Sequence, residues 1–145
     1  MYFDTSYIAK FYCNEPESSR VRDLVRSADA IYSSRWALAE FHAVLHSRVR
    51  EGKYSHTIAS DLASRFSAHI EDGLWILMPV TEGLLRRTSA LLLSAPPELF
   101  LRTADAVHLT AAQDAGQREV WTNNRHMLAA AAYFGLAGRS VQAGE

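Results

Sequence analysis

Apolar residues along this chain change repeatedly between two spacings. Short apolar runs, such as "LWILMPV" at residues 74–80, are typical of strands, whereas apolar residues three and four positions apart are typical of one helical face. The short runs predict strands over residues 1–4, 30–34, 74–80 and 119–122, with a weaker edge strand over 140–143. The longer periodic stretches predict helices over residues 5–12, 18–27, 35–51, 55–71, 81–94, 103–115 and 125–133. Because strands and helices alternate, we expect a sheet covered by helices.

Capping and turn residues mark the ends of these elements. Gly52 and Gly116 each follow a periodic stretch, as expected of glycines that close helices. Ser18 or Ser19 is expected to cap the second helix. The third and fourth helices follow one another closely in the sequence, so we expect them to form an antiparallel hairpin. The strand over 74–80 is apolar throughout and is expected to be buried.

Length and composition limit the classes of protein to which the chain can belong. Its 145 residues make one ordinary domain, so residues 1–145 are interpreted as a single domain. Because 15 Lys and Arg residues nearly balance 16 Asp and Glu residues, any site for a polyanion must be local. The absence of an apolar run near the roughly 20 residues of a membrane span, and of a secretion signal, favours a soluble cytoplasmic protein. The single cysteine, Cys13, excludes an internal disulfide and a thiolate metal cluster.

Asp4 is the first residue whose position favours a chemical role. It ends the first apolar run, and the following Thr5 and Ser6 begin a helix, so a short strand would place this carboxylate at the carboxyl edge of the sheet. Ligands of open α/β sheets bind at that edge. The alternative is that Asp4 only caps the helix, since Asp is a preferred N-cap residue.

Glu40 lies on an apolar helical face. The residues three and four positions from it are Trp36, Ala37, Ala43 and Val44. Because glutamate is seldom buried without a partner, either this face is open to a cleft or a cation meets the carboxylate. The alternative to a functional role is an internal salt bridge to one of the arginines.

Asp105 repeats this arrangement within "LFLRTADAVHLTAAQDAG". Its helical face also carries Leu101, His108, Leu109 and Ala112. Two structural explanations stay open: Thr103 could cap the helix and make Asp105 a first-turn acid, and Arg102 could pair with its carboxylate. A functional role is favoured because Asp4, Glu40 and Asp105 all fall at strand ends or early helical turns, where one cleft could collect them.

Three carboxylates collected in one cleft would repel one another, and their pKa values would rise unless a cation compensated. Oxygen ligands from Asp and Glu, without cysteine, suit Mg²⁺ or Mn²⁺ better than Zn²⁺. Such sites typically act on phosphate esters, where the ion activates a water molecule and neutralises charge on the phosphoryl oxygens. The sequence has no Gly-rich phosphate loop, which argues against nucleotide hydrolysis of the P-loop kind.

Four stretches, in order along the chain, resemble the successive motifs of PIN-domain proteins, most closely the VapC-type toxins of bacterial toxin–antitoxin modules. They are "MYFDTSYIAKFYCNEPES", "SSRWALAEFHAVLHSRVREG", "LRTADAVHLTAA" and "VWTNNRHMLAAAAYFGLAG". The resemblance implies a three-layer α/β/α sandwich around a mostly parallel sheet, with a protruding helical hairpin. It also implies endoribonuclease activity on structured RNA of the tRNA or rRNA class, dependent on Mg²⁺ or Mn²⁺, with inhibition by a cognate antitoxin and homodimerisation.

The resemblance gives the chain an acidic metal site with supporting hydroxyls, formed by Asp4, Glu40, Asp105, Ser6 and Thr122. The family's fourth acid follows Thr by two positions, and here "TNN" puts Asn124 in that place. An amide oxygen can coordinate a metal or orient water, but it brings no negative charge and cannot act as a base. Asn124 is either the natural residue or a replacement that disarms a toxic nuclease. The alternative to an active nuclease is a catalytically weakened PIN domain that still binds RNA or antitoxin.

Basic residues near these motifs are candidates for RNA contact. Arg125 and His126 directly follow Asn124, and Arg102 precedes Asp105, so all three are placed to contact a phosphate. A helical stripe could also follow an RNA backbone, although such stripes are usually solvated faces: Arg35, His42, His46, Arg50 and Lys53.

Two other chemistries have weaker support in the sequence. His42 and His46 have the one-turn spacing of a zinc pair, but the Glu expected beside the first His and a third ligand are missing. An apolar strand ending in Asp4 also suggests a haloacid-dehalogenase-like phosphatase, but Ser6 stands where that chemistry needs a second acid. His108 is interpreted as a histidine that packs its helix against the core.

Overall fold

The computed structural model describes residues 1–142, in which five strands form one parallel sheet. The strands are β1 (Tyr2–Phe3), β2 (Ile31–Ser34), β3 (Trp75–Met78), β4 (Glu119–Trp121) and β5 (Ala137–Arg139). They lie in the order β3-β2-β1-β4-β5, and every neighbouring pair is parallel. The chain therefore adds strands on one side of β1 and then on the other, which puts a topological switch point between β1 and β4.

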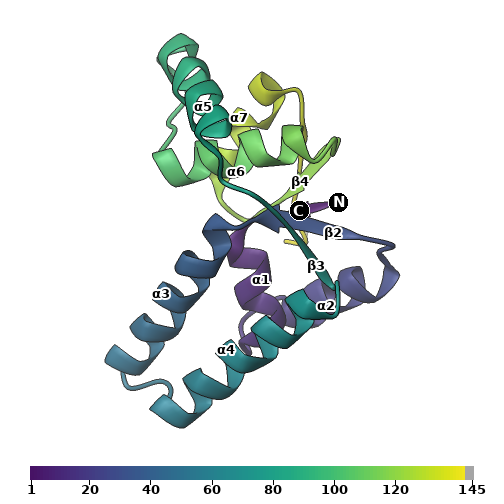
Figure 1. Cartoon of the computed structure of the whole chain (residues 1–145), viewed down its shortest axis with the longest axis vertical. Coiled ribbons are helices and arrows are strands. Elements are labelled where there is room, and N and C mark those ends of the chain that lie inside the picture. Colours follow the sequence, from purple (N-terminus) through teal and green to yellow (C-terminus); the bar gives the residue numbers. More distant parts are fainter. Residues whose placement is uncertain (143–145) are drawn as a thin grey trace.

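Helices cover both faces of the sheet (Figure 1). One face carries α1 (Thr5–Tyr12), α2 (Ser18–Ser27), α3 (Trp36–Arg50) and α4 (His56–Glu71). The other face carries α5 (Glu82–Ser94), α6 (Thr103–Asp114), α7 (Arg125–Ala130) and the 3-10 turn η1 (Ala131–Phe134). The packed helices α3 and α4 extend away from the sheet (Figure 1), so the three-layer sandwich with a protruding hairpin is confirmed. Within residues 1–142, none of these helices is both long enough and apolar enough to cross a membrane.

The last strand lies earlier in the chain than its apolar pattern indicated. The predicted edge strand over 140–143 was wrong, because the strand is β5, while Ala143 lies outside the described residues. Gly135, at a φ of 71°, turns the chain after η1 and returns it to the sheet. Leu136 is buried at this turn, so the next residues add to β4 immediately. The predicted helix over 125–133 is α7 continued by η1.

Two other local expectations also need correction. Neither predicted serine caps α2: Glu17 precedes the helix in a left-handed conformation, and the Ser18 hydroxyl donates to the Cys13 carbonyl. The strand over 74–80 is not fully buried, because β3 forms an edge of the sheet. Trp75 is buried in the core, whereas Ile76 is 38% exposed.

Candidate active site

A cleft of about 690 Å³ opens at the carboxyl edge of the sheet. Its walls come from the start of α1, from α3 and α6, and from the loop after β4. The polar side chains lining it include Asp4, Ser6, Glu40, Asp105, His108 and Asn124. The three acids that the sequence singled out therefore line one cleft beside the switch point, where open parallel sheets bind their ligands.

Asp4 lies at the end of β1 and caps α1. Its Oδ1 accepts hydrogen bonds from Ser6 Oγ at 2.6 Å and from the Tyr7 amide at 3.1 Å, and its Oδ2 accepts one from Thr122 Oγ1 at 2.6 Å. Burial raises the pKa of Asp4, and the hydrogen bonds from Ser6 and Thr122 offset part of that rise. Both roles considered for Asp4 thus occur together, since it caps a helix and presents a carboxylate to the cleft.

Glu40 is held by a histidine rather than by the arginine that the salt-bridge alternative required. Its Oε1 accepts hydrogen bonds from Thr5 Oγ1 at 2.8 Å and from His108 Nε2 at 2.6 Å. Burial raises the pKa of Glu40, but the hydrogen bond and charge of His108, with the bond from Thr5, outweigh burial, so its pKa is lowered. Because Oε1 is engaged, Oε2 is the oxygen left to act in the cleft.

His108 connects Glu40 to the core through its second nitrogen. The Tyr2 hydroxyl lies 2.8 Å from His108 Nδ1, and both side chains are buried. Burial raises the pKa of Tyr2 well above its ordinary value, so the phenol keeps its proton while it contacts Nδ1. The other ring nitrogen, Nε2, faces Glu40 Oε1, so a hydrogen on Nε2 points at the Glu40 carboxylate. The sequence signal for this role was the position of His108 on the same helical face as Asp105.

Asp105 lies in the first turn of α6 and is engaged by two neighbours. Asn124 Nδ2 donates to Oδ1 at 3.3 Å, and Arg102 Nε donates to Oδ2 at 3.4 Å. The predicted pairing with Arg102 is confirmed. The predicted cap is wrong, because Thr103 is the first residue inside α6 and no side chain caps that helix.

Asn124 follows β4 and caps α7. Its Oδ1 accepts hydrogen bonds from the amides of His126 at 2.9 Å and Met127 at 3.4 Å. The backbone amide of Asn124 donates to Thr122 Oγ1 at 2.9 Å, and the Thr122 hydroxyl donates in turn to Asp4. Asn124 is therefore a helix cap and also a polar link between the two aspartates.

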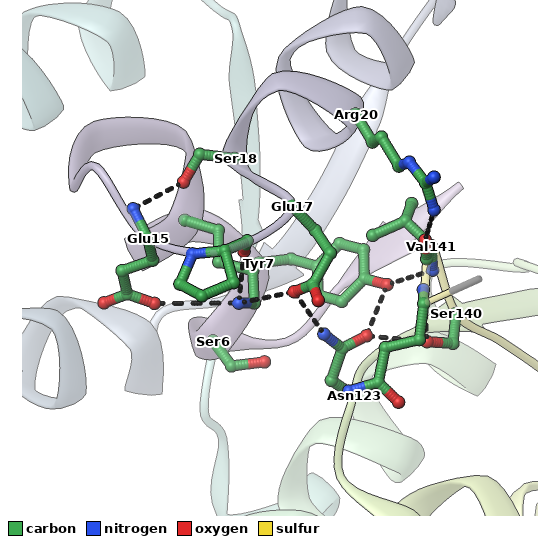
Figure 2. A network of polar contacts seen from close by, with 12 residues as sticks. Ser6, Tyr7, Glu15, Glu17, Ser18, Arg20, Asn123, Ser140 and Val141 are labelled. Atoms are coloured by element: carbon green, nitrogen blue, oxygen red, sulfur yellow. Dashed lines mark hydrogen bonds and ion pairs between the residues drawn. The ribbon is translucent and has the colours of Figure 1, made fainter.

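A polar network fixes the flank of the cleft near α2 (Figure 2). Asn123 Oδ1 accepts hydrogen bonds from Tyr7 Oη at 2.9 Å and from Ser140 Oγ at 2.7 Å. The Val141 amide donates to Tyr7 Oη at 2.7 Å, which ties the segment after β5 to α1. Asn123 Nδ2 donates to Glu17 Oε2 at 3.4 Å. Sequence reasoning missed this network because its members come from four separate segments.

The donors in the cleft suit a hard divalent ion, since they are carboxylate, hydroxyl and amide oxygens. Among residues 1–142, no three His, Cys, Asp or Glu side chains lie close enough together to hold one ion. Mg²⁺ usually keeps several waters and binds proteins through one or two carboxylates, so this arrangement still fits it. Direct coordination of one ion by Asp4, Glu40 and Asp105 together stays a prediction.

The basic residues expected to contact RNA fall into two groups. Arg102 and His126 contact two residues that line the cleft, Asp105 and Asn124, and Arg125 precedes His126 at the start of α7. Two histidines of the predicted stripe on α3, His42 and His46, line a separate groove between α3 and α4. Lys53 of the same stripe lies beyond the end of α3 and forms a salt bridge with Glu51. The zinc hypothesis gains no support, since the described residues hold no metal-binding group of three.

Comparisons with known proteins agree with this architecture. A sequence model of the PIN domain matches residues 1–133. The crystal structure of Mycobacterium tuberculosis VapC20, described as a sarcin–ricin loop cleaving toxin, superposes with a TM-score of 0.70. The superposition covers 89% of this chain and 93% of that chain at 19% sequence identity, which shows a shared fold. No curated protein sequence matches the chain.

Proposed function

This chain belongs to the PIN domain family, and from that premise we propose that it is a divalent-metal-dependent endoribonuclease acting as the toxin of a toxin–antitoxin pair. The observation that carries the proposal is the placement of Asp4, Glu40 and Asp105 in one cleft at the switch point of the sheet. The description of VapC20 as cleaving the sarcin–ricin loop supports a structured RNA as the substrate class.

The proposed roles follow from the contacts of each side chain. Asp4 and Asp105 would hold a Mg²⁺ or Mn²⁺ ion, with water completing its shell. When bound, such an ion lowers the pKa of its water and neutralises charge on the phosphoryl oxygens. Glu40, kept ionised by His108, orients the attacking water and accepts its proton at Oε2. Arg102 is placed to hold a phosphate at the edge of the cleft.

A cleavage assay tests this function. The full chain is incubated with a sarcin–ricin hairpin or with total tRNA, in Mg²⁺, in Mn²⁺ or in EDTA. We expect ion-dependent cleavage that falls about a hundredfold or more, equivalent to about 2.7 kcal/mol, in Asp4→Asn and Asp105→Asn. Asp29→Asn is the matched control, because it removes the same charge from an exposed loop before β2. Cleavage that persists in EDTA, or full activity of both cleft variants, would contradict the proposal.

Asn124 favours a second candidate, a weakened PIN domain that binds RNA or antitoxin without efficient cleavage. Its side chain caps α7 and donates to Asp105, so the position adds no negative charge to the cleft. RNA binding measured by filter retention, together with no ion-dependent cleavage of either RNA, would support this candidate. Efficient cleavage by the unmodified chain would exclude it.

The hairpin of α3 and α4 is the proposed surface for an antitoxin and for a second copy of the chain. A groove of about 240 Å³ between these helices is lined by apolar side chains, histidines and one serine, and Ile58 nearby is 47% exposed. An amphipathic helix buries its apolar face in grooves of this kind. Light scattering should therefore give a dimer without antitoxin, and a strict monomer at high concentration would contradict the homodimer.

A further inference from the structure

Phe100 is held outward by the loop that precedes α6. It is 56% exposed, whereas its neighbours Leu99 and Leu101 are partly buried and pack on the core beneath α6. The Leu99 amide donates to the Pro96 carbonyl at 3.0 Å, which closes a turn just before Phe100. Because the loop is anchored on both sides, the Phe100 ring is presented to solvent, and a ligand that contacts it does not have to order the loop.

The exposed ring lies against His126, with ring centroids 4.5 Å apart and planes inclined by 47°. The His126 amide donates to Asn124, which lines the cleft. On the other side, Arg102 follows Phe100 closely in the chain and contacts Asp105 in the same cleft. The two rings therefore neighbour the cleft lining through two separate elements, the start of α7 and the loop before α6.

Two exposed arginines are close to these rings in the chain. The Arg102 side chain is 65% exposed, and within residues 1–142 only its Nε is engaged, so its terminal nitrogens are available to a ligand. Arg125, next to His126, is exposed and forms no salt bridge with any described residue. Single-stranded nucleic acid is bound by this combination, with phosphates on cations and bases stacked on aromatic rings. A duplex cannot use the rings in this way, because its base faces are already stacked.

We propose that Phe100 and His126 form a stacking platform for one unpaired base beside the cleaved phosphodiester, with Arg102 and Arg125 on the adjoining phosphates. This inference rests on the proposed ribonuclease function. It narrows the substrate to RNA in which the cleaved segment contains an unpaired base, as in a loop or a bulge.

Fluorescence of a hairpin RNA with 2-aminopurine in its loop tests the platform. The full chain is titrated in EDTA, where binding is measured without ion-dependent cleavage, and a fully paired duplex of equal length is titrated beside it. Phe100→Ala should weaken hairpin binding about tenfold or more, abolish the quenching of 2-aminopurine and leave duplex binding unchanged. Phe100→Trp should restore both signals, and Leu93→Ala, which truncates a side chain that is 90% exposed, should change neither.

Several results would overturn the platform. One is an unchanged affinity of Phe100→Ala for the hairpin. Another is an equal loss of affinity for the hairpin and the duplex, in a variant whose thermal unfolding shows that it is folded. A changed oligomeric state with unchanged RNA affinity would assign Phe100 to a protein partner instead. Ion-dependent cleavage with the same KM in Phe100→Ala and in the unmodified chain would contradict the stacking platform and support the ribonuclease function. Loop-specific quenching of 2-aminopurine by a chain that cleaves no RNA would support base stacking on the platform and contradict the ribonuclease function.

Discussion

Replacing Asn124 by Asp adds the charge that the fourth position of the site lacks. The cap on α7 would survive, because an Asp oxygen can accept the same amide hydrogen bonds from His126 and Met127. The donor to Asp105 would not survive, since Asn124 Nδ2 lies 3.3 Å from Asp105 Oδ1 and a carboxylate oxygen would replace it. A favourable contact thus becomes a repulsion between two carboxylates.

The size of that repulsion follows from Coulomb's law. Two unit charges about 5 Å apart interact by about 3 kcal/mol at an effective dielectric constant of about 20. Since Asn124 is only half-buried, we expect solvent to reduce this to about 1–2 kcal/mol. Without metal, Asn124→Asp should therefore lower the melting temperature by about 3–6 °C. With a divalent ion bound, the same charge becomes attractive, and each 1.4 kcal/mol recovered strengthens binding about tenfold.

Titration calorimetry with Mn²⁺, melting curves with and without Mn²⁺, and cleavage time courses measure these effects at equal ionic strength. We expect lower metal-free stability, tighter Mn²⁺ binding and faster cleavage in Asn124→Asp. Asn14→Asp is the matched control, because Asn14 is exposed and the added charge lies outside the cleft. Unchanged stability, metal affinity and rate in Asn124→Asp would refute the reasoning and leave Asn124 as a helix cap alone.

Three other substitutions give distinct stability signatures in melting curves without metal. The raised pKa of Asp4 means that its carboxyl stabilises the fold fully below the unfolded pKa, and that this stabilisation is lost as pH rises through the folded pKa. Asp4→Asn should therefore melt about 3 °C higher than the unmodified chain at pH 7, and at the same temperature as the unmodified chain in acid. The lowered pKa of Glu40 has the opposite consequence: Glu40→Gln should lose about 1 kcal/mol at pH 7, and the difference should vanish as pH falls through the folded pKa of Glu40. Gly138→Ala should cost about 1–3 kcal/mol at every pH, because a Cβ there would lie 3.0 Å from Leu128 Cδ2 and 3.2 Å from Leu128 O. A pH-independent effect of either acid substitution, or a neutral Gly138→Ala, would contradict the corresponding geometry.

The grouping of the three acids could be predicted from the sequence because it depends on local rules. Parallel strands bring their carboxyl ends to one edge, and Asp4 directly follows such a strand. Glu40 and Asp105 stood out because each interrupts an apolar helical face, which the packing of α3 and α6 then places beside the same cleft.

The partners of these acids could not be predicted, because they depend on contacts between distant residues. Tyr2 and His108, whose contact anchors the imidazole ring that meets Glu40, are 106 positions apart. The position of β5 depended on Gly135 and on the close approach of Gly138 to α7, whereas apolar alternation favoured a strand a few residues later. Glu17 adopts a left-handed conformation that no local preference of glutamate explains.

The most direct test of the account is the anomalous scattering of Mn²⁺ in crystals of the full chain. The account predicts a Mn²⁺ peak in the cleft, with carboxylate oxygens of Asp4 and Asp105 about 2.2 Å from it and Glu40 within reach of its bound water. A cleft without Mn²⁺ at a concentration that supports RNA cleavage, or Mn²⁺ bound elsewhere while Asp4 and Asp105 have none, would contradict it.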